Sequence, residues 1–209
     1  MVFVEFFAGT QKMTETFEFH KVQAYSLDFV QLKKTRKLNL CMDFLDFETS
    51  LINHDHINIM FFGLPCTTFS KASGGKHFNQ IREPKTAQAH KSIELVNKMF
   101  EIIKENPNAI YYIENPSGGI LNHKFFLDKV KEHEAHIYNL SMLSFGFSTQ
   151  KKTIIVTNSK HLLISPLTYR CNGRYQKTKF DNLSLKKRQA YTPSFCEHIY
   201  NNAILNFNQ

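Results

Sequence analysis

The sequence predicts an α/β fold in which a mostly parallel, twisted sheet carries helices on both faces. Short apolar runs of strand length alternate with longer stretches of helical periodicity, which is the pattern of βαβ units. The run at residues 57–62 is apolar except for Asn58, as expected of a central parallel strand buried on both faces. Small, acidic and sulfur-bearing residues follow the ends of these runs, where such sheets bind ligands.

The first part of the chain is expected to contribute three strands before the central one. Each is a short apolar run that ends at a small or acidic residue. The runs cover residues 2–6, 22–27 and 38–42, and they end at Ala8-Gly9, Asp28 and Asp43. A mixed polar and apolar stretch between the first two runs ends at Phe19.

The clearest helix follows the central strand. Its apolar residues recur at steps of three and four, and they are Ala89, Ile93, Val96, Phe100 and Ile103. Thr86 is expected to cap this helix, and Asn106-Pro107 to end it. The remaining elements are a strand at residues 110–113, a helix at 124–132, a strand at 153–156 and a helix at 194–205 behind Pro193.

Length and composition are those of one soluble globular domain. The chain has 209 residues, of which 42% are hydrophobic. No apolar run approaches the roughly 18 residues of a membrane helix, and the first residues lack the basic leader of a signal peptide. We therefore expect a soluble, intracellular protein without a membrane partner, in the cytoplasm, the nucleus or a viral factory. Four cysteines without a CxxC pair predict neither a disulfide framework nor a metal site.

Positive charge is concentrated in one segment. The net charge is +8, and residues 151–188 contain ten Lys or Arg against one acid, Asp181, so this segment carries +9. Tyr169, Tyr175 and Phe180 lie among these cations. Cations with aromatic rings suit a phosphate backbone and an unstacked base, although a merely solvated face has the same composition. We expect a nucleic acid partner and one domain, residues 1–209, with a short basic insert at about 159–190.

Three strand ends suit a cofactor that contains a nucleoside. The first strand leads into the turn Phe7-Ala8-Gly9-Thr10, which has one glycine. Asp28, at the end of the second strand, is placed to accept hydrogen bonds from ribose hydroxyls. Asp43, after the third strand, is placed to accept from an adenine amino group. Each aspartate alone would equally suit a helix cap or a turn, but the ordered set favours a ligand.

Two further strand ends carry reactive groups. Cys66 follows the most buried strand on a turn that Pro65 stiffens, and a reactive thiolate there needs a positive charge or a helix N-terminus nearby. Glu114 ends the next strand and would face the same crevice. A glutamic acid in a closed, dry pocket keeps its proton and can donate it to a ring nitrogen. A buried, inert cysteine and a turn-capping glutamate are the structural alternatives.

These motifs resemble those of the cytosine-C5 methyltransferase family, and they occur in that family's order. The similarity covers nearly the whole chain, and the Pro-Cys-x-x-Phe-Ser loop followed by Glu-Asn-Pro is its most specific part. The segments are Glu5-Phe6-Phe7-Ala8-Gly9-Thr10 for motif I, Gly63-Leu64-Pro65-Cys66-Thr67-Thr68-Phe69-Ser70 for the nucleophile loop, Glu114-Asn115-Pro116, Gln150-Lys151-Lys152 for motif VIII, and residues 189–199 for motif X.

The resemblance implies a class I S-adenosylmethionine-dependent methyltransferase (Rossmann-like) fold and DNA (cytosine-5-)-methyltransferase activity. Cys66 would add to C6 of a flipped-out cytosine while Glu114 protonates N3. The implied cofactor is S-adenosyl-L-methionine, with Phe7, Ala8, Gly9, Thr10, Asp28, Asp43 and Pro65 as its binding residues. The implied partner is DNA, contacted by Ser70, Asn115, Lys151 and Lys152, with both lysines at a phosphate.

Three features depart from the family pattern. Motif I has Gly9-Thr10-Gln11 where a second glycine is usual, and motif VIII has lysines where arginine is usual. Only about thirty residues separate the late strand from motif X, where the family places a larger target-recognition region. A short segment makes few contacts to base edges, so we expect short or relaxed sequence specificity, or a protein partner that supplies it.

Two other functions stay open at this point. A tRNA cytosine-C5 methyltransferase of the same fold would use the same catalytic residues. A non-catalytic, methyltransferase-like subunit that binds nucleic acid would explain the altered glycine loop and the small recognition region, but it would not need both Cys66 and Glu114.

Overall fold

The computed structural model describes residues 1–32, 35–52, 56–70, 73–148, 151–161 and 190–207. Its strands are β1 (Val2–Phe6), β2 (Gln23–Asp28), β3 (Leu40–Cys41), β4 (Ile59–Gly63), β5 (Ile110–Pro116), β6 (His136–Ser141) and β7 (Lys152–Thr157). Its α-helices are α1 (Lys12–Phe19), α2 (Ala87–Glu105), α3 (Lys124–Glu132) and α5 (Pro193–Phe207). Short 3₁₀ turns are η1 (Phe44–Asp46), η2 (Thr49–Leu51), η4 (Ile120–Asn122) and η5 (Met142–Phe145).

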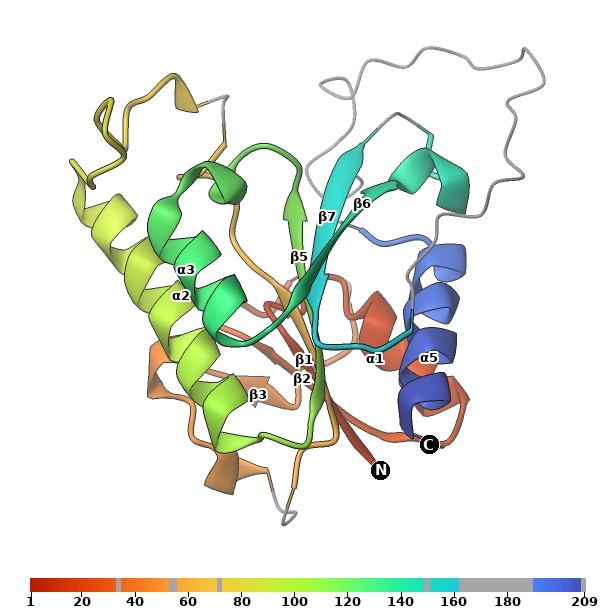
Figure 1. Cartoon of the computed structure of the whole chain (residues 1–209). Helices are drawn as coiled ribbons and strands as arrows, with labels where there is room; N and C mark the ends of the chain where they lie inside the picture. The colour runs from red at the N-terminus through yellow and green to blue at the C-terminus, as the bar shows by residue number, and fades with distance from the viewer. Residues whose placement is uncertain (33–34, 53–55, 71–72, 149–150, 162–189, 208–209) are drawn as a thin grey trace.

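The strands form one sheet in the order β3-β2-β1-β4-β5-β7-β6. Strands β1 to β5 pair in parallel, and β7 runs antiparallel to both of its neighbours, β5 and β6. Helices α2 and α3 cover one face of the sheet, and α1 and α5 cover the other (Figure 1). This is the mostly parallel, Rossmann-like α/β sheet with helices on both faces that the sequence predicts, so the predicted fold class is confirmed.

Two hydrophobic clusters fill the layers on either side of the sheet. Successive side chains of a strand point to opposite faces, and the central strands are apolar at nearly every position. Phe62 of β4 therefore packs in the cluster beneath α2, while Phe61 packs in the cluster beneath α1 and α5. Both rings are fully buried, as expected for a strand covered on two sides.

Local signals place most of these elements correctly. The Thr86 side chain accepts a hydrogen bond from the Ala89 amide and so caps α2, which ends before Asn106 as predicted. Strand β5 runs three residues beyond the predicted end, because Glu114, Asn115 and Pro116 pair with β7. Strand β6 was not predicted, since it lies at the edge of the sheet with only Leu140 buried and has no continuous apolar run.

The register of the central strands sets the geometry of the site. Phe6 of β1 lies opposite Phe62 of β4, and Gly63 of β4 lies opposite Glu114 of β5. The carboxyl ends of the three strands therefore lie side by side. Most of the expected basic insert, residues 162–189, falls outside the described residues. Among the described residues, no helix is both long and apolar enough to cross a membrane.

Candidate active site

The candidate site lies where β1 and β4 are neighbours in the sheet. Strand β2 follows β1 in the chain, but β1 also pairs with β4 on its other side, so the direction of strand succession reverses here. Ligands of open α/β sheets bind outside the carboxyl ends of the strands at this kind of reversal. The turn at residues 7–10 follows β1 and the loop at residues 64–70 follows β4, so both flank the reversal.

The turn after β1 keeps a tight shape despite its single glycine. Phe7, Gly9 and Gln11 have φ angles of 57°, 46° and 58°, all in the left-handed region. A glutamine in that region costs of the order of 1 kcal/mol relative to glycine. Hydrogen bonds offset this cost, because the buried Gln11 side chain accepts from Ser26 Oγ at 2.9 Å and donates to the Arg36 carbonyl at 2.7 Å.

Asp28 holds this turn against β2. Its Oδ2 accepts from the Gly9 amide at 2.9 Å, and its Oδ1 accepts from the Phe29 amide at 2.8 Å. The Ala8 amide donates to the Leu27 carbonyl at 3.0 Å and adds a second tie. Ionised carboxylate oxygens can each accept more than one hydrogen bond, so Asp28 retains acceptor capacity for a ribose diol.

Asp43 has a structural role in this conformation. Its Oδ1 accepts from the Leu45 amide at 3.1 Å and caps η1, while its Oδ2 pairs with Lys91 of α2 at 2.8 Å. The Lys91 hydrogen bond is the main reason that the pKa of Asp43 lies below its usual value. Asp43 thus has the helix-capping role that the sequence analysis gave as the alternative to binding a ligand. Its contact with an adenine amino group stays a prediction.

The loop that carries Cys66 is fixed by contacts from three sides. Asn115 Nδ2 donates to the Leu64 carbonyl at 3.2 Å, and Thr68 Oγ1 donates to Ser92 Oγ at 2.8 Å. Within the loop, the Ser70 amide donates to the Cys66 carbonyl at 2.9 Å.

Phe69 anchors the same loop through its ring and its backbone. The ring stacks on Phe78 at 5.6 Å between centroids and meets the His123 ring edge-on at 5.1 Å. Gly119 lies so close to the Phe69 carbonyl that an added Cβ would stand 2.9 Å from the oxygen. The backbone around the sulfur is therefore held before any substrate arrives.

Cys66 is half-buried, and its neighbour Pro65 is exposed. Burial is the largest cause that raises the pKa of the Cys66 thiol, the negative charge of Glu114 adds to it, and Lys151 opposes both. The predicted positive charge near the thiol is thus present as Lys151, but burial and Glu114 outweigh it. The thiol is the favoured form at neutral pH.

Glu114 and Cys66 follow neighbouring strand ends, since Glu114 lies opposite Gly63 and Asn115 holds the Leu64 carbonyl, and the charge of Glu114 raises the pKa of Cys66. Glu114 is 5% exposed. Its Oε1 lies 3.3 Å from Lys151 Nζ, an ion contact without hydrogen-bond geometry, and its Oε2 accepts from the Tyr191 hydroxyl at 3.1 Å. Neither Oε1 nor the buried Asn115 Oδ1 has a hydrogen-bond partner among the described residues. Such buried oxygens are costly unless a ligand satisfies them.

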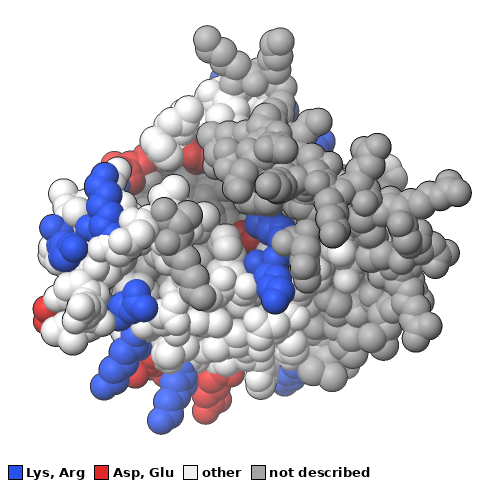
Figure 2. Space-filling view, turned by 90° about the horizontal axis from the view of Figure 1, so that it is seen from above, with Lys and Arg blue, Asp and Glu red and all other residues white. Residues whose placement is uncertain are grey.

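The two lysines of the predicted phosphate contact lie in different surroundings. The Lys151 side chain is 13% exposed and points to Glu114, whereas Lys152 is exposed at the start of β7. Gln150, beside them, lies outside the described residues. Figure 2 looks onto the molecule from above and shows the Lys and Arg side chains in small groups, one of them near the centre of the view beside an acidic side chain.

Tyr191 is the functional residue that sequence reasoning missed. It lies in the motif X segment, 77 positions from its partner Glu114, and no local pattern links the two. The proline that starts α5 two residues later marks a helix but says nothing about where the preceding ring points.

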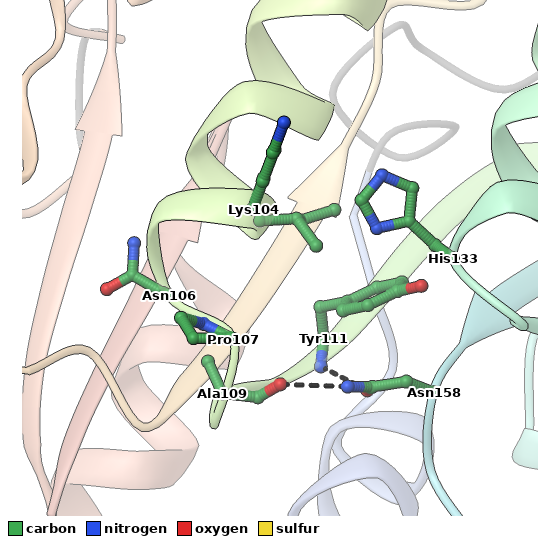
Figure 3. A pocket seen from close by; sticks show the side chains of 8 residues that line it. Lys104, Asn106, Pro107, Ala109, Tyr111, His133 and Asn158 are labelled. Atoms are coloured by element: carbon green, nitrogen blue, oxygen red, sulfur yellow. Dashed lines mark hydrogen bonds between the residues drawn. The ribbon is translucent and has the colours of Figure 1, made fainter.

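A separate cavity of about 240 Å³ lies at the opposite edge of the sheet (Figure 3). Lys104, Tyr111 and His133 line it, and Asn158 closes it with hydrogen bonds to the Tyr111 amide and the Ala109 carbonyl. Tyr111 lies near the start of β5 and Glu114 near its end. None of the site residues predicted from sequence lines this cavity.

Comparisons with known proteins give only distant likenesses. No protein-family profile and no curated protein sequence matches the chain. A solved structure of a Spodoptera frugiperda DNMT2 mutant is similar at 16% identity and a TM-score of 0.47, over 75% of this chain and 49% of that one. The methyltransferase EhMeth of Entamoeba histolytica is 14% identical, with a TM-score of 0.47, over 78% and 55%.

The Dnmt2 methyltransferase of S. pombe is 10% identical, with a TM-score of 0.48, over 75% of this chain and 48% of that chain. This chain thus spans about half the length of each of these three proteins. Likeness at this level carries no statement about what the chain acts on.

Proposed function

We propose that this protein transfers a methyl group from S-adenosyl-L-methionine to C5 of cytosine in DNA through a covalent adduct with Cys66. One observation carries the proposal: a thiol and a carboxylate follow the ends of adjacent parallel strands at the reversal of the sheet, close enough that the charge of Glu114 raises the pKa of Cys66. A nucleophile and a proton-transferring group on one pyrimidine ring are what attack at C6 requires.

The residues divide the chemistry between them. Cys66 Sγ forms a bond to C6 as its proton passes to the Glu114 carboxylate, and Glu114 delivers a proton to N3 while the electron pair of the C5–C6 double bond moves into the ring. The cofactor supplies an electrophilic methyl group for C5. Water then takes the C5 proton, the Sγ–C6 bond breaks, and the ring regains its double bond. Glu114 takes the proton back from N3 and returns it to Sγ, which restores the resting thiol and carboxylate.

The residues after β1 and β2 fit such a cofactor. Their turn closes tightly with three left-handed residues, and Asp28 presents a carboxylate beside it with acceptor capacity to spare. Phe7, Ala8, Gly9 and Thr10 would line the cofactor, and Pro65 would approach it from the nucleophile loop. Asp28 would hold the ribose hydroxyls.

Lys151 is better placed for the base than for a phosphate. Its side chain lies inside the site beside Glu114, and it lowers the pKa of Cys66. We therefore propose that Lys151 contacts the flipped cytosine and stabilises the thiolate, while the exposed Lys152 contacts the backbone. Asn115 holds the Leu64 carbonyl and Ser70 lies within the loop turn, so both would position Cys66 and the base.

A duplex DNA substrate has to expose the ring before the reaction. Both faces of C6 are covered in a stacked duplex, so the enzyme must flip the cytosine out. With the short basic segment as its recognition region, we propose relaxed specificity or a protein partner that supplies it.

Trapping with 5-fluorocytosine tests this proposal. Fluorine at C5 cannot leave as a proton, so the adduct of Cys66 stalls after methyl transfer. We expect a covalent complex on duplex DNA that contains 5-fluorocytosine, dependent on S-adenosyl-L-methionine, and none with Cys66→Ser. The control is Cys41→Ser, which removes an exposed thiol beside Asp28 and leaves the nucleophile loop unchanged.

The same assay separates the remaining functions. A covalent complex on tRNA but not on DNA would show that RNA is the substrate and would overturn the proposal that the protein acts on DNA. Binding of nucleic acid and cofactor without any adduct or transferred methyl group would overturn the enzymatic proposal in favour of a binding subunit.

A further inference from the structure

The Tyr191 ring is held rigidly at the edge of the site. It lies edge-on against Phe61 of β4 at 5.3 Å between centroids and packs on Phe195 of α5 at 5.4 Å. Lys151 Nζ lies 5.8 Å from the ring centroid on another side. With these neighbours, the hydroxyl has one direction in which to point, toward the carboxyl ends of β4 and β5.

Gly63 makes room for this hydroxyl. A Cβ added at Gly63 would stand 2.9 Å from the Tyr191 oxygen and 3.4 Å from the Phe7 carbonyl. The absence of a side chain there lets Tyr191 pass over the end of β4 and reach Glu114 Oε2 on β5 at 3.1 Å. Gly63 and Glu114 are direct neighbours in the sheet, so the space left by the missing side chain adjoins the carboxylate.

The Tyr191 hydroxyl is the donor in its hydrogen bond with Glu114. Burial and the negative charge of Glu114 raise the pKa of Tyr191 well above its usual value, so the hydroxyl keeps its proton. A neutral hydroxyl beside a carboxylate gives a charge-assisted hydrogen bond, which is stronger than a neutral one.

We propose that Tyr191 is a positioning residue that fixes Glu114 by occupying Oε2 and so assigns Oε1 to the pyrimidine ring. This inference rests on the proposed function. Oε1 is the buried carboxylate oxygen that lacks a hydrogen-bond partner among the described residues, and Lys151 lies 3.3 Å from it. A bound cytosine would then contact Glu114 Oε1. The carboxylate cannot rotate away, because its Oε2 is hydrogen-bonded to Tyr191.

The test variant is Tyr191→Phe, which keeps the ring packing and removes the oxygen. Single-turnover methyl transfer at saturating cofactor and DNA is expected to slow roughly 10- to 100-fold, the value of one hydrogen bond to a charged group, with little change in KM. The matched control is Tyr200→Phe on α5, whose ring packs on Phe17 and His20 away from the site and whose rate is expected to match the wild type. An unchanged rate for Tyr191→Phe overturns the inference.

Alkylation of Cys66 provides a readout that needs no methyl transfer. The charged groups that act on this thiol are Glu114, which raises its pKa, and Lys151, which lowers it. Glu114→Gln is expected to move the pH profile of iodoacetamide labelling, followed on the Cys66 peptide by mass spectrometry, to lower pH. Tyr191→Phe frees the carboxylate to turn away and is expected to move the profile in the same direction by less, with no further shift in the Glu114→Gln background.

Methyl transfer and Cys66 alkylation together distinguish a failure of the proposed function from a failure of the positioning role. If the wild type transfers no methyl group to DNA or tRNA, the proposed function fails while the labelling profile still tests the position of Glu114. A profile that Tyr191→Phe leaves unchanged, or shifts equally with Gln at position 114, overturns the positioning role.

Gly63→Ala gives an independent check by double-mutant cycle. The new Cβ meets the Tyr191 oxygen and is expected to lower the transfer rate in the wild-type background, with at most a small effect once Tyr191→Phe has removed that oxygen. Equal losses in both backgrounds would show that Gly63 and Tyr191 act separately and would overturn the inference.

Discussion

At the scale of single residues, the site brings one thiol and two opposite charges together. Burial and Glu114 favour the neutral thiol of Cys66, and Lys151 opposes them. The resting protein therefore keeps its nucleophile protonated, and a shift in this balance on substrate binding would produce the thiolate. Lys151 controls the protonation of Cys66 in two ways. Its positive charge favours the thiolate, and it also offsets the negative charge of the buried Glu114.

Replacing Lys151 by methionine removes this charge at similar length. Because Lys151 lowers the pKa of Cys66, its loss raises that pKa further, and the labelling profile of Cys66 moves to higher pH. Methyl transfer is expected to slow roughly tenfold or more, as when a preorganised charge is removed from an active site. The control is Lys152→Met, which removes an exposed cation from the next position. A larger effect at Lys152 than at Lys151 would contradict this assignment.

Glu5 is a second buried carboxyl group, and it bears on stability. Burial raises its pKa from the usual 4.5 to about 7, although hydrogen bonds from the Thr14 amide and hydroxyl oppose the shift. The folded protein then binds the Glu5 proton more tightly than the unfolded chain does. Its free energy of unfolding is expected to fall by about 3 kcal/mol between pH 4.5 and 7, with the full benefit present only below that window.

Glu5→Gln should remove this slope. Urea unfolding between pH 4 and 8 measures it, with the exposed Glu101→Gln as a control that retains the wild-type slope. A Glu5→Gln curve that runs parallel to the wild type would show that Glu5 is not the titrating group.

At the scale of elements, the nucleophile loop depends on the turn after β5. Gly119 packs on the Phe69 carbonyl, and a Cβ there would approach the oxygen to 2.9 Å. The Phe69 carbonyl oxygen belongs to the backbone and cannot change rotamer to relieve the clash. Gly119→Ala must therefore displace the loop that carries Cys66.

We expect Gly119→Ala to lower the free energy of unfolding by about 1–3 kcal/mol, typical of overpacking, and to slow methyl transfer. Thermal unfolding and single-turnover kinetics measure the two effects. Ser117→Ala, in the same turn, adds no atom and serves as the control. Full activity with Gly119→Ala would mean that the loop position is not critical.

At the scale of the whole molecule, most of the positive charge lies apart from the catalytic residues in the chain, with Lys151 as the exception. The net charge of +8 comes from residues 151–188, whereas Cys66 and Glu114 lie at the ends of the central strands. DNA affinity is therefore expected to depend on cations that take no part in the chemistry.

The affinity for duplex DNA should fall linearly with salt on a logarithmic plot. Replacing Lys186 and Lys187 together by glutamine should reduce the slope by roughly 1 to 2, close to one for each phosphate that is no longer neutralised. Fluorescence anisotropy between low and moderate salt measures this slope. Removal of two acids, Glu101→Gln with Glu105→Gln on α2, is the matched control. A slope that the lysine changes leave intact would place DNA on another surface.

Elements with strong local signals were predictable from the sequence. Helix α2 has its periodic apolar residues, its Thr86 cap and its stop at Asn106, and β4 has its unbroken apolar run. The edge strand β6 lacked such a signal because one row of its side chains meets solvent. The left-handed conformation of Gln11 could not be predicted from the sequence either. It is unfavourable for glutamine, and hydrogen bonds from Ser26 and to Arg36, which only the fold brings close, stabilise it.

The sequence by itself determined the types of reactive groups, their order along the chain and the strand ends on which they stand, because strand and helix periodicities are local. Only the tertiary structure decided which groups meet. The register between β4 and β5 and the alternation of side chains place Glu114 on the face that α5 covers, and so bring it to Tyr191 and Lys151. Contacts between distant residues depend on how layers pack, and no local pattern records that packing.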